Sequence, residues 1–310
     1  MRHLLVTCSV AASALTTVSA LQPFTYGNIL VCGNGQVFEY TRQGQLVQTI
    51  GVPQAPGGDG EPRGIAVTSS GDLVVYNGTF QAAISHLRMS TGTWTHYLVP
   101  GLSTVNNVTM GKVTTFGNYV FATDCSTYGG GEANGLVRLD LSDGTWTRFG
   151  PADNSIDVVA GQDGLLYALW GSGSPSGTVI RSFDPWTLSG VQTFSPPNPT
   201  YTNRSIAVDA AGNIYVSQLY GGVMKLSPSM QLLASYNVSG WSTDVRISDD
   251  GVVMLMAEGG TVLLDAELNH IRTFANDGSF GTFVSVPEPS ALATLAAGLV
   301  VLLQAKRRRL

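Results

Sequence analysis

The chain has 310 residues, of which 44% are hydrophobic and only 12% are charged, and its formal net charge is −5. An acidic chain with so few lysines and arginines lacks the basic surface that nucleic acids require, so nucleic acid is excluded as a partner. Three cysteines are too few for a scaffold held together by disulfides.

The first 20 residues have the three parts of a secretory signal peptide. A basic start at Met1–His3 precedes an apolar stretch over residues 4–15, and small residues follow at 18–20. We therefore predict that the Sec machinery exports the chain and that cleavage follows Ala20.

Residues 21–286 repeat one unit that consists of an apolar strand, a tight turn and a second apolar strand. The clearest pair of repeats is Arg63–Tyr76 and Arg204–Ser217. The turns supply the positive φ angle that a tight hairpin requires. They recur six times, at Gly27-Asn28, Gly71-Asp72, Gly117-Asn118, Asp163-Gly164, Gly212-Asn213 and Asp250-Gly251.

A period near 45 residues with four short strands per unit is typical of β-propellers. The sequence therefore predicts an all-β fold, a six-bladed β-propeller, with blades at about 27–51, 63–99, 105–150, 155–195, 203–239 and 242–276. The first unit lacks its leading strand, and residues 281–286 are predicted to supply it and close the ring. A two-sheet sandwich is the alternative.

The runs at 65–73 and 206–214 resemble the six-bladed families related to NHL repeats, gluconolactonases and streptogramin lyases. This resemblance implies the blade and not an activity, because propellers include hydrolases, lyases, lectins and inert scaffolds.

Aligning the units on their turns places polar residues where the innermost strands begin, at the mouth of the central channel. Arg63 and Arg204 share one position, and the next position holds Gly64, Asp157, Ser205 and Asp244, while Asn107 lies near the start of the third blade. Such a rim is suited to a small anion, a sugar or calcium. The alternative is that these side chains satisfy one another.

Gluconolactonase-like families hold a divalent cation with carboxylates and an asparagine, and the resemblance implies Asp157, Asp244 and Asn107 for that role. The glutamate expected near the first inner strand is missing. A lyase that needs a histidine base has no candidate at the mouth, because His86, His96 and His270 are predicted on outer hairpins.

Other residues favour packing over chemistry. Trp94 and Trp146 occupy matching places in two units, which predicts core or inter-blade packing, with a sugar-stacking platform as the alternative. Cys32 and Cys125 are each predicted inside a strand, as buried small hydrophobic residues, and a single bridge between them is the alternative.

The C-terminal residues 287–310 combine Pro287-Glu288-Pro289, an apolar run over 291–303 and a basic end that includes Arg307, Arg308 and Arg309. This order resembles the PEP-CTERM sorting signal of Gram-negative bacteria, which implies processing by an exosortase. As a helix, residues 291–305 would rise about 22 Å, which is short for a hydrocarbon core of about 30 Å. A plain tail anchor is the alternative.

Two classes of function follow. The first is a non-catalytic binding or structural protein of the envelope or matrix. A link to exopolysaccharide rests only on the resemblance, because PEP-CTERM proteins as a group look like partners of exopolysaccharide production. It would be anchored in the inner membrane by the C-terminal helix until processed and would then lie at the cell surface or outside. The alternative is a calcium-type lactonase or esterase at the propeller mouth.

Overall fold

A computed structural model of the chain describes residues 21–56, 61–79, 81–103, 111–126, 134–171, 178–197, 203–276 and 278–285. These residues contain 24 β-strands and no α-helix. Nothing in this part of the chain is a helix long and apolar enough to cross a membrane. The predicted signal peptide with Ala20, the Pro287–Pro289 motif and the basic tail with Arg307, Arg308 and Arg309 all lie outside the described residues.

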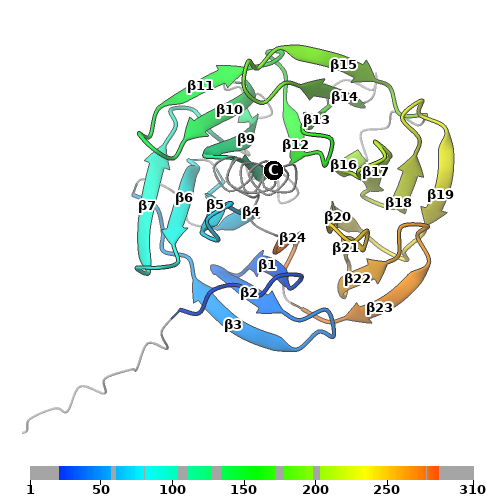
Figure 1. Cartoon of the computed structure of the whole chain (residues 1–310), viewed down its shortest axis with the longest axis horizontal. Helices are drawn as coiled ribbons and strands as arrows, with labels where there is room; N and C mark the ends of the chain where they lie inside the picture. Colours follow the sequence, from blue (N-terminus) through cyan, green and yellow to red (C-terminus); the bar gives the residue numbers. More distant parts are fainter. Residues whose placement is uncertain are drawn as a thin grey trace, which may run out of the picture.

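The strands form six separate four-stranded antiparallel sheets arranged around a central axis (Figure 1). From the axis outwards, the first blade contains β24 (Phe280–Phe283), β1 (Ile29–Gly33), β2 (Gln36–Tyr40) and β3 (Leu46–Gly51). The second contains β4 (Pro62–Val67), β5 (Leu73–Asn77), β6 (Ala83–Arg88) and β7 (Thr93–Leu98). The third contains β8 (Val113–Phe116), β9 (Tyr119–Cys125), β10 (Asn134–Asp140) and β11 (Trp146–Phe149).

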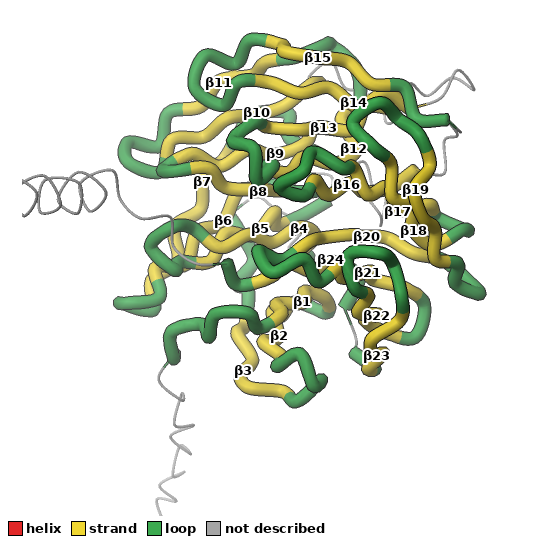
Figure 2. Tube along the Cα trace, turned by 45° about the vertical axis from the view of Figure 1, so that its right-hand side comes forward, coloured by secondary structure: helices red, strands yellow, loops and turns green. Residues whose placement is uncertain are grey.

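The remaining blades follow in chain order. The fourth contains β12 (Ser155–Ala160), β13 (Leu166–Gly171), β14 (Thr178–Phe183) and β15 (Gly190–Phe194). The fifth contains β16 (Asn203–Val208), β17 (Ile214–Gln218), β18 (Gly222–Leu226) and β19 (Leu232–Tyr236). The sixth contains β20 (Ser242–Ile247), β21 (Val253–Ala257), β22 (Gly260–Leu264) and β23 (His270–Phe274). In Figure 2 the turns and loops gather at the ends of these strands.

The predicted six-bladed propeller is therefore confirmed, and the two-sheet sandwich is wrong. All six predicted turns lie between an innermost strand and the second strand of a blade, and the glycine of each turn has a positive φ, from 56° at Gly117 to 83° at Gly164 and Gly251. The turn at Gly27 differs from the others, because the innermost strand of its blade, β24, comes from the C-terminal part of the chain. The amide of Gly27 donates to the carbonyl of Val284 at 2.9 Å.

The ring closes as predicted, by pairing C-terminal with N-terminal sequence. Strand β24 pairs with β1 in antiparallel register, with Leu30 opposite Thr282. This pairing gives β1 a partner on its inner side and removes the free strand edge that an unclosed ring would present.

The core consists of six apolar clusters, each between two neighbouring blades. Valine, isoleucine and leucine predominate in four of them, and aromatic or methionine side chains make up much of the other two. Cys32 lies in the cluster between the first and second blades, and Cys125 lies in the one between the fourth and fifth. Both are buried and unpaired. Their interpretation as small hydrophobic residues is confirmed, and the single bridge is not present.

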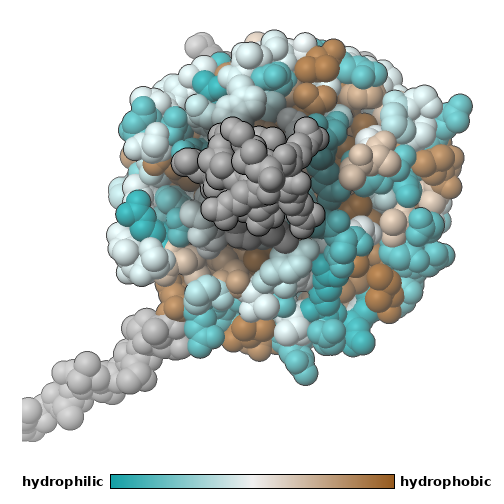
Figure 3. Space-filling model, in the orientation of Figure 1, coloured by the Kyte–Doolittle hydropathy of each residue, from teal (hydrophilic) through white to brown (hydrophobic). Residues whose placement is uncertain are grey.

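The outer strands have few buried residues, and exposed apolar side chains such as Leu233, Val191 and Ile271 lie on them. On the face in Figure 3, hydrophobic residues occur in small groups separated by hydrophilic ones. Trp94 packs partly buried against the cluster between the first and second blades, as predicted. Trp146 is 40% exposed on β11, so it does not lie in the core, while inter-blade packing and sugar stacking stay predictions for it.

Candidate functional site

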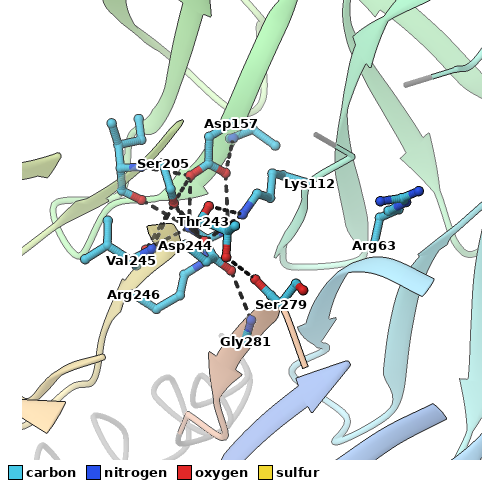
Figure 4. Close-up of polar contacts among 12 residues, drawn as sticks. Arg63, Lys112, Asp157, Ser205, Thr243, Asp244, Val245, Arg246, Ser279 and Gly281 are labelled. Atoms are coloured by element: carbon cyan, nitrogen blue, oxygen red, sulfur yellow. Dashed lines mark hydrogen bonds and ion pairs between the residues drawn. The ribbon is translucent and has the colours of Figure 1, made fainter. Parts of the chain in front are cut away.

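Three of the innermost strands carry a bulge at the same place, and each bulge precedes a polar residue. The pairing register shifts between Ser155 and Asp157 in β12, between Asn203 and Ser205 in β16, and between Ser242 and Asp244 in β20. A bulge re-aims the side chain that follows it. Asp157, Ser205 and Asp244 consequently meet, and they form a polar cluster with Lys112 and Arg246 (Figure 4), here called the channel cluster.

Asp157 is completely buried and accepts hydrogen bonds on both carboxylate oxygens. Its Oδ1 accepts from the amide of Val158 at 2.7 Å and from Nη2 of Arg246 at 3.1 Å. Its Oδ2 accepts from the amide of Ile206 at 2.8 Å and from Nη1 of Arg246 at 2.9 Å. The bidentate pair with the guanidinium is the strong form of this interaction.

Asp244 is paired with the buried lysine. Its Oδ1 lies 2.8 Å from Nζ of Lys112 and 2.9 Å from Nη1 of Arg246, and its Oδ2 accepts from the amide of Gly281 at 3.0 Å. Burial opposes the charged carboxylate, but Arg246 and Lys112 outweigh it and hold the pKa of Asp244 below its ordinary value.

Lys112 comes immediately before β8 and is fully buried. Its Nζ donates to the carbonyl of Thr243 at 3.2 Å and lies 4.4 Å from the centre of the Phe280 ring. Burial lowers the pKa of Lys112, and the negative charge of Asp244 partly offsets that shift. For Arg246 the nearby carboxylates of Asp157 and Asp244 outweigh burial and raise the pKa.

The hydroxyl of Ser205 lies between the two carboxylates, at 2.5 Å from Oδ2 of Asp157 and 2.7 Å from Oδ1 of Asp244. It also accepts from the amide of Val245 and from Nη1 of Arg246. A hydroxyl has one proton and can donate to only one carboxylate at a time. The positive charges of Lys112 and Arg246 therefore make this close approach of two carboxylates tolerable.

The other predicted site residues do not join the channel cluster. Arg63 is buried, its Nη2 lies 3.4 Å from Glu61, and Figure 4 shows its side chain apart from the cluster. Arg204 is the bulge residue of β16, one position before Ser205, and it is half-buried. Asn107 lies outside the described residues. His86, His96 and His270 lie on third or fourth strands, as predicted.

The channel cluster does not fit a calcium ion. Calcium takes six to eight oxygen ligands, and its carboxylate ligands must turn their lone pairs towards the metal. Here all four carboxylate oxygens of Asp157 and Asp244 face N–H or ammonium donors, and two positive charges already balance the two negative ones. Among the described residues, no group of three or more histidine, cysteine, aspartate or glutamate side chains is arranged to hold a metal.

A cavity of about 540 Å³ lies where the innermost strands end. Every blade contributes to its lining, and Arg246 lines it as well as belonging to the channel cluster. Seven of its side chains carry neutral polar groups, namely Thr68, Ser69, Thr114, Thr115, Gln162, Thr282 and Ser285. Two of these link different blades. Oγ1 of Thr115 donates to the carbonyl of Val67 in the neighbouring second blade, and Nε2 of Gln162, in the fourth blade, donates to the carbonyl of Ser248 in the sixth.

The sequence matches no protein-family model and no curated protein sequence. Its fold is similar to solved propellers. One is a chain of a nidogen–laminin complex, with a TM-score of 0.64, 11% identity, and coverage of 84% of this chain and 98% of that one. Another is a gluconolactonase from Xanthomonas campestris, with a TM-score of 0.53, 16% identity, and coverage of 72% and 75%.

A third is the calcium-binding protein regucalcin from Agrobacterium tumefaciens, with a TM-score of 0.54, 14% identity, and coverage of 73% and 78%. The chain is thus a six-bladed β-propeller that resembles the gluconolactonase fold. At these identities the similarity shows the fold alone and no activity.

Two members of the channel cluster were missed by the sequence analysis. Arg246 follows Asp244 by two residues on the same strand, and residues two apart lie on one face of a strand, so this signal was present in the sequence. Lys112 lies just before β8, in the least regular repeat, and it contacts Asp244 across 132 positions of sequence. No local pattern predicts that contact.

Proposed function

We propose that this chain is an exported, non-catalytic binding propeller of the cell envelope or extracellular matrix, with extracellular polysaccharide as its partner class. The proposal includes Sec-dependent export, exosortase processing near Pro287 and release from the inner membrane to the surface or beyond. The sequence features at both termini support the export and processing, and the centre of the propeller supports the absence of catalysis.

The observation that carries the proposal is the saturation of the channel cluster. A carboxylate that holds a catalytic metal or acts as a general base needs free lone pairs within reach of the substrate. Asp157 and Asp244 are instead buried and held by Arg246 and Lys112. This arrangement is what a structural plug across the channel requires.

Calcium-dependent lactone hydrolysis is the competing function, because the fold is similar to a gluconolactonase and to regucalcin. The test measures hydrolysis of glucono-δ-lactone with calcium, zinc or manganese, and the thermal unfolding midpoint with and without calcium. We expect the rate without protein to equal the rate with it. We also expect no shift of the midpoint, whereas a ligand at 100 times its Kd would add about 2.7 kcal/mol.

Metal-dependent hydrolysis that is lost in a folded Asp244→Asn variant would overturn the non-catalytic proposal. The processing proposal has a separate test, the intact mass of the protein recovered from its host's envelope and medium. We expect a mass that lacks residues 1–20 and ends near Pro287. A mass that continues to Leu310 would show a plain tail anchor and would remove the support for a polysaccharide partner.

A further inference from the structure

The cavity at the ends of the innermost strands is a second candidate site, and it shares Arg246 with the channel cluster. Its volume of about 540 Å³ is within the usual range of small-molecule sites, about 300–1,000 Å³. Hydroxyl and amide side chains from the second, third and fourth blades line it, among them Ser69, Thr114 and Gln162. Such a wall offers both donors and acceptors to a polar ligand.

The charges around this cavity favour a neutral ligand. Arg246 lines it, but its guanidinium is bound to Asp157 at 2.9 Å and 3.1 Å and to Asp244 at 2.9 Å. Among the described lining residues the only other charged side chain is Asp249. An anion would therefore meet no uncompensated positive charge there, and a cation would meet a single exposed carboxylate.

An exposed tryptophan lies beside this cavity. The ring of Trp186 is 57% exposed, and it makes edge-to-face contacts with Phe116 at 5.4 Å and with Tyr119 at 5.8 Å between ring centres. Phe116 and the next residue, Gly117, both line the cavity. A Cβ on Gly117 would lie 3.4 Å from the Trp186 ring, so the ring lies against two residues that line the cavity, although Trp186 does not line it itself.

The backbone holds Trp186 in place while its ring faces solvent. Its amide donates to Oδ1 of Asp184 at 2.9 Å, and its carbonyl accepts from Nη1 of Arg138 at 2.9 Å. The backbone amides of Thr187 and Trp186 keep the pKa of Asp184 below its ordinary value, so this turn is held at neutral pH. The ring is therefore presented on a fixed support.

The turn itself does not require a tryptophan. Ser142 in the third blade and Glu267 in the sixth occupy the same place, each donating its amide to the aspartate two residues earlier, at 2.8 Å and 3.0 Å. These residues are polar, as expected for an exposed turn. A large ring held in the open beside a polar cavity is available to stack on the apolar face of a ligand.

We propose that the cavity and Trp186 together bind a neutral oligosaccharide. A sugar ring has an apolar C–H face, which stacks on Trp186, and a rim of hydroxyls, which exchange hydrogen bonds with the threonine, serine and glutamine side chains of the cavity. This proposal deepens the proposed binding function and rests on it, because it names the site and the ligand class.

The test titrates the full chain with neutral oligosaccharides built from glucose, galactose, mannose or N-acetylglucosamine, with an oligogalacturonate as the anionic comparison. Binding is measured by isothermal titration and by saturation-transfer NMR on the sugar. The site variant is Trp186→Ala. The matched control is Trp146→Ala, which removes a tryptophan that is 40% exposed on β11 of the neighbouring blade. Thermal midpoints establish that both variants are folded.

We expect at least one neutral oligosaccharide to bind, with affinity reduced about tenfold or more in Trp186→Ala and unchanged in Trp146→Ala. Binding of none of the neutral sugars, or preferential binding of the oligogalacturonate, would overturn the ligand class. Equal affinity of wild type and a folded Trp186→Ala would overturn the site. Neither result bears on catalysis, which only the metal-dependent lactone assay addresses, so the two proposals fail separately. If Trp186→Ala does not fold, Ser69→Ala and Gln162→Ala replace it with the same criteria.

Discussion

At the scale of single residues, the channel cluster determines how this propeller is held at its axis. It combines two carboxylates and two cations that are nearly or completely buried. Removing one partner of such a set leaves a buried charge without compensation, which is far more costly than the net contribution of the intact pair.

Lys112→Met tests this point. Methionine keeps much of the apolar contact with Phe280 but leaves Asp244 with Arg246 as its sole cationic partner. We expect the free energy of unfolding, measured with urea, to fall by about 3 kcal/mol. Lys225→Met is the control, because Nζ of Lys225 contacts the carbonyl of Ala266 at 2.9 Å in a partly exposed position, and we expect a loss below about 1 kcal/mol there. Similar losses for the two variants would contradict a special role for the channel cluster.

At the scale of elements, the third strand of three blades has, as its first or second residue, a glycine that the packing requires. Gly135, Gly222 and Gly260 each have a positive φ, of 89°, 86° and 137°. A Cβ on Gly135 would lie 2.6 Å from the carbonyl oxygen of Phe149, and the other two glycines face the end of their own fourth strand more closely still. The fourth strand can pair in register only because these positions have no side chain.

Gly222→Ala should therefore destabilise the fifth blade. The new methyl group would collide with the carbonyl of Tyr236, and the alanine would have to keep a positive φ that is unfavourable for it. We expect a loss of about 2 kcal/mol in urea unfolding. Gly190→Ala is the matched control at the start of another strand, where a Cβ meets no atom within 4 Å, and we expect a change within about 0.5 kcal/mol. A neutral Gly222→Ala would show that the β18–β19 pairing shifts without cost.

At the scale of the whole molecule, closure of the ring joins the two ends of the propeller. Strand β24 brings the amide of Gly281 to Asp244, so the strand that closes the first blade also binds the channel cluster. A second link lies at the periphery, where Arg42 of the first blade makes a bidentate pair with Asp250 of the sixth at 2.6 Å and 2.8 Å. In the channel cluster, Lys112 of the third blade binds Asp244 of the sixth, so the cluster spans most of the ring.

The Arg42–Asp250 pair predicts a dependence on acid pH. The guanidinium holds the pKa of Asp250 well below its ordinary value. In the unfolded chain this carboxyl has a pKa of about 3.9. The stabilisation of the fold by the ion pair is therefore complete above that pH and is lost as pH falls through the lower folded-state pKa. The Asp250 side chain is 54% exposed, and solvent screening limits the contribution to about 1 kcal/mol or less.

We therefore expect the difference in unfolding free energy between wild type and Arg42→Met to shrink as pH falls below about 4, and to shrink in about 1 M salt at neutral pH. Arg272→Met, a change at an exposed arginine on β23, is the control and should show neither dependence. A difference that is constant with pH would mean that Arg42 acts through packing and not through its charge.

The sequence by itself determined the architecture, because a propeller repeats a local signal. Each of these glycine-containing turns needs only its neighbours to impose a positive φ, and six of them, 38 to 49 residues apart, predict six blades. The missing leading strand of the first unit predicts a closing strand near residue 281. The same alignment placed Asp157, Ser205 and Asp244 at one position of the ring. The signals at both termini lie outside the described residues and stay predictions.

Only the tertiary structure decided what those residues do. The sequence left Asp157 and Asp244 open to calcium, a sugar or one another, because their partners depend on contacts across the channel. Lys112 and Arg246 reach them from the third and sixth blades, and burial then makes pairing obligatory. The position of Trp186 was also decided only by the tertiary structure. Its exposure and its place beside Phe116 follow from how the third and fourth blades pack, and from no feature of its own repeat.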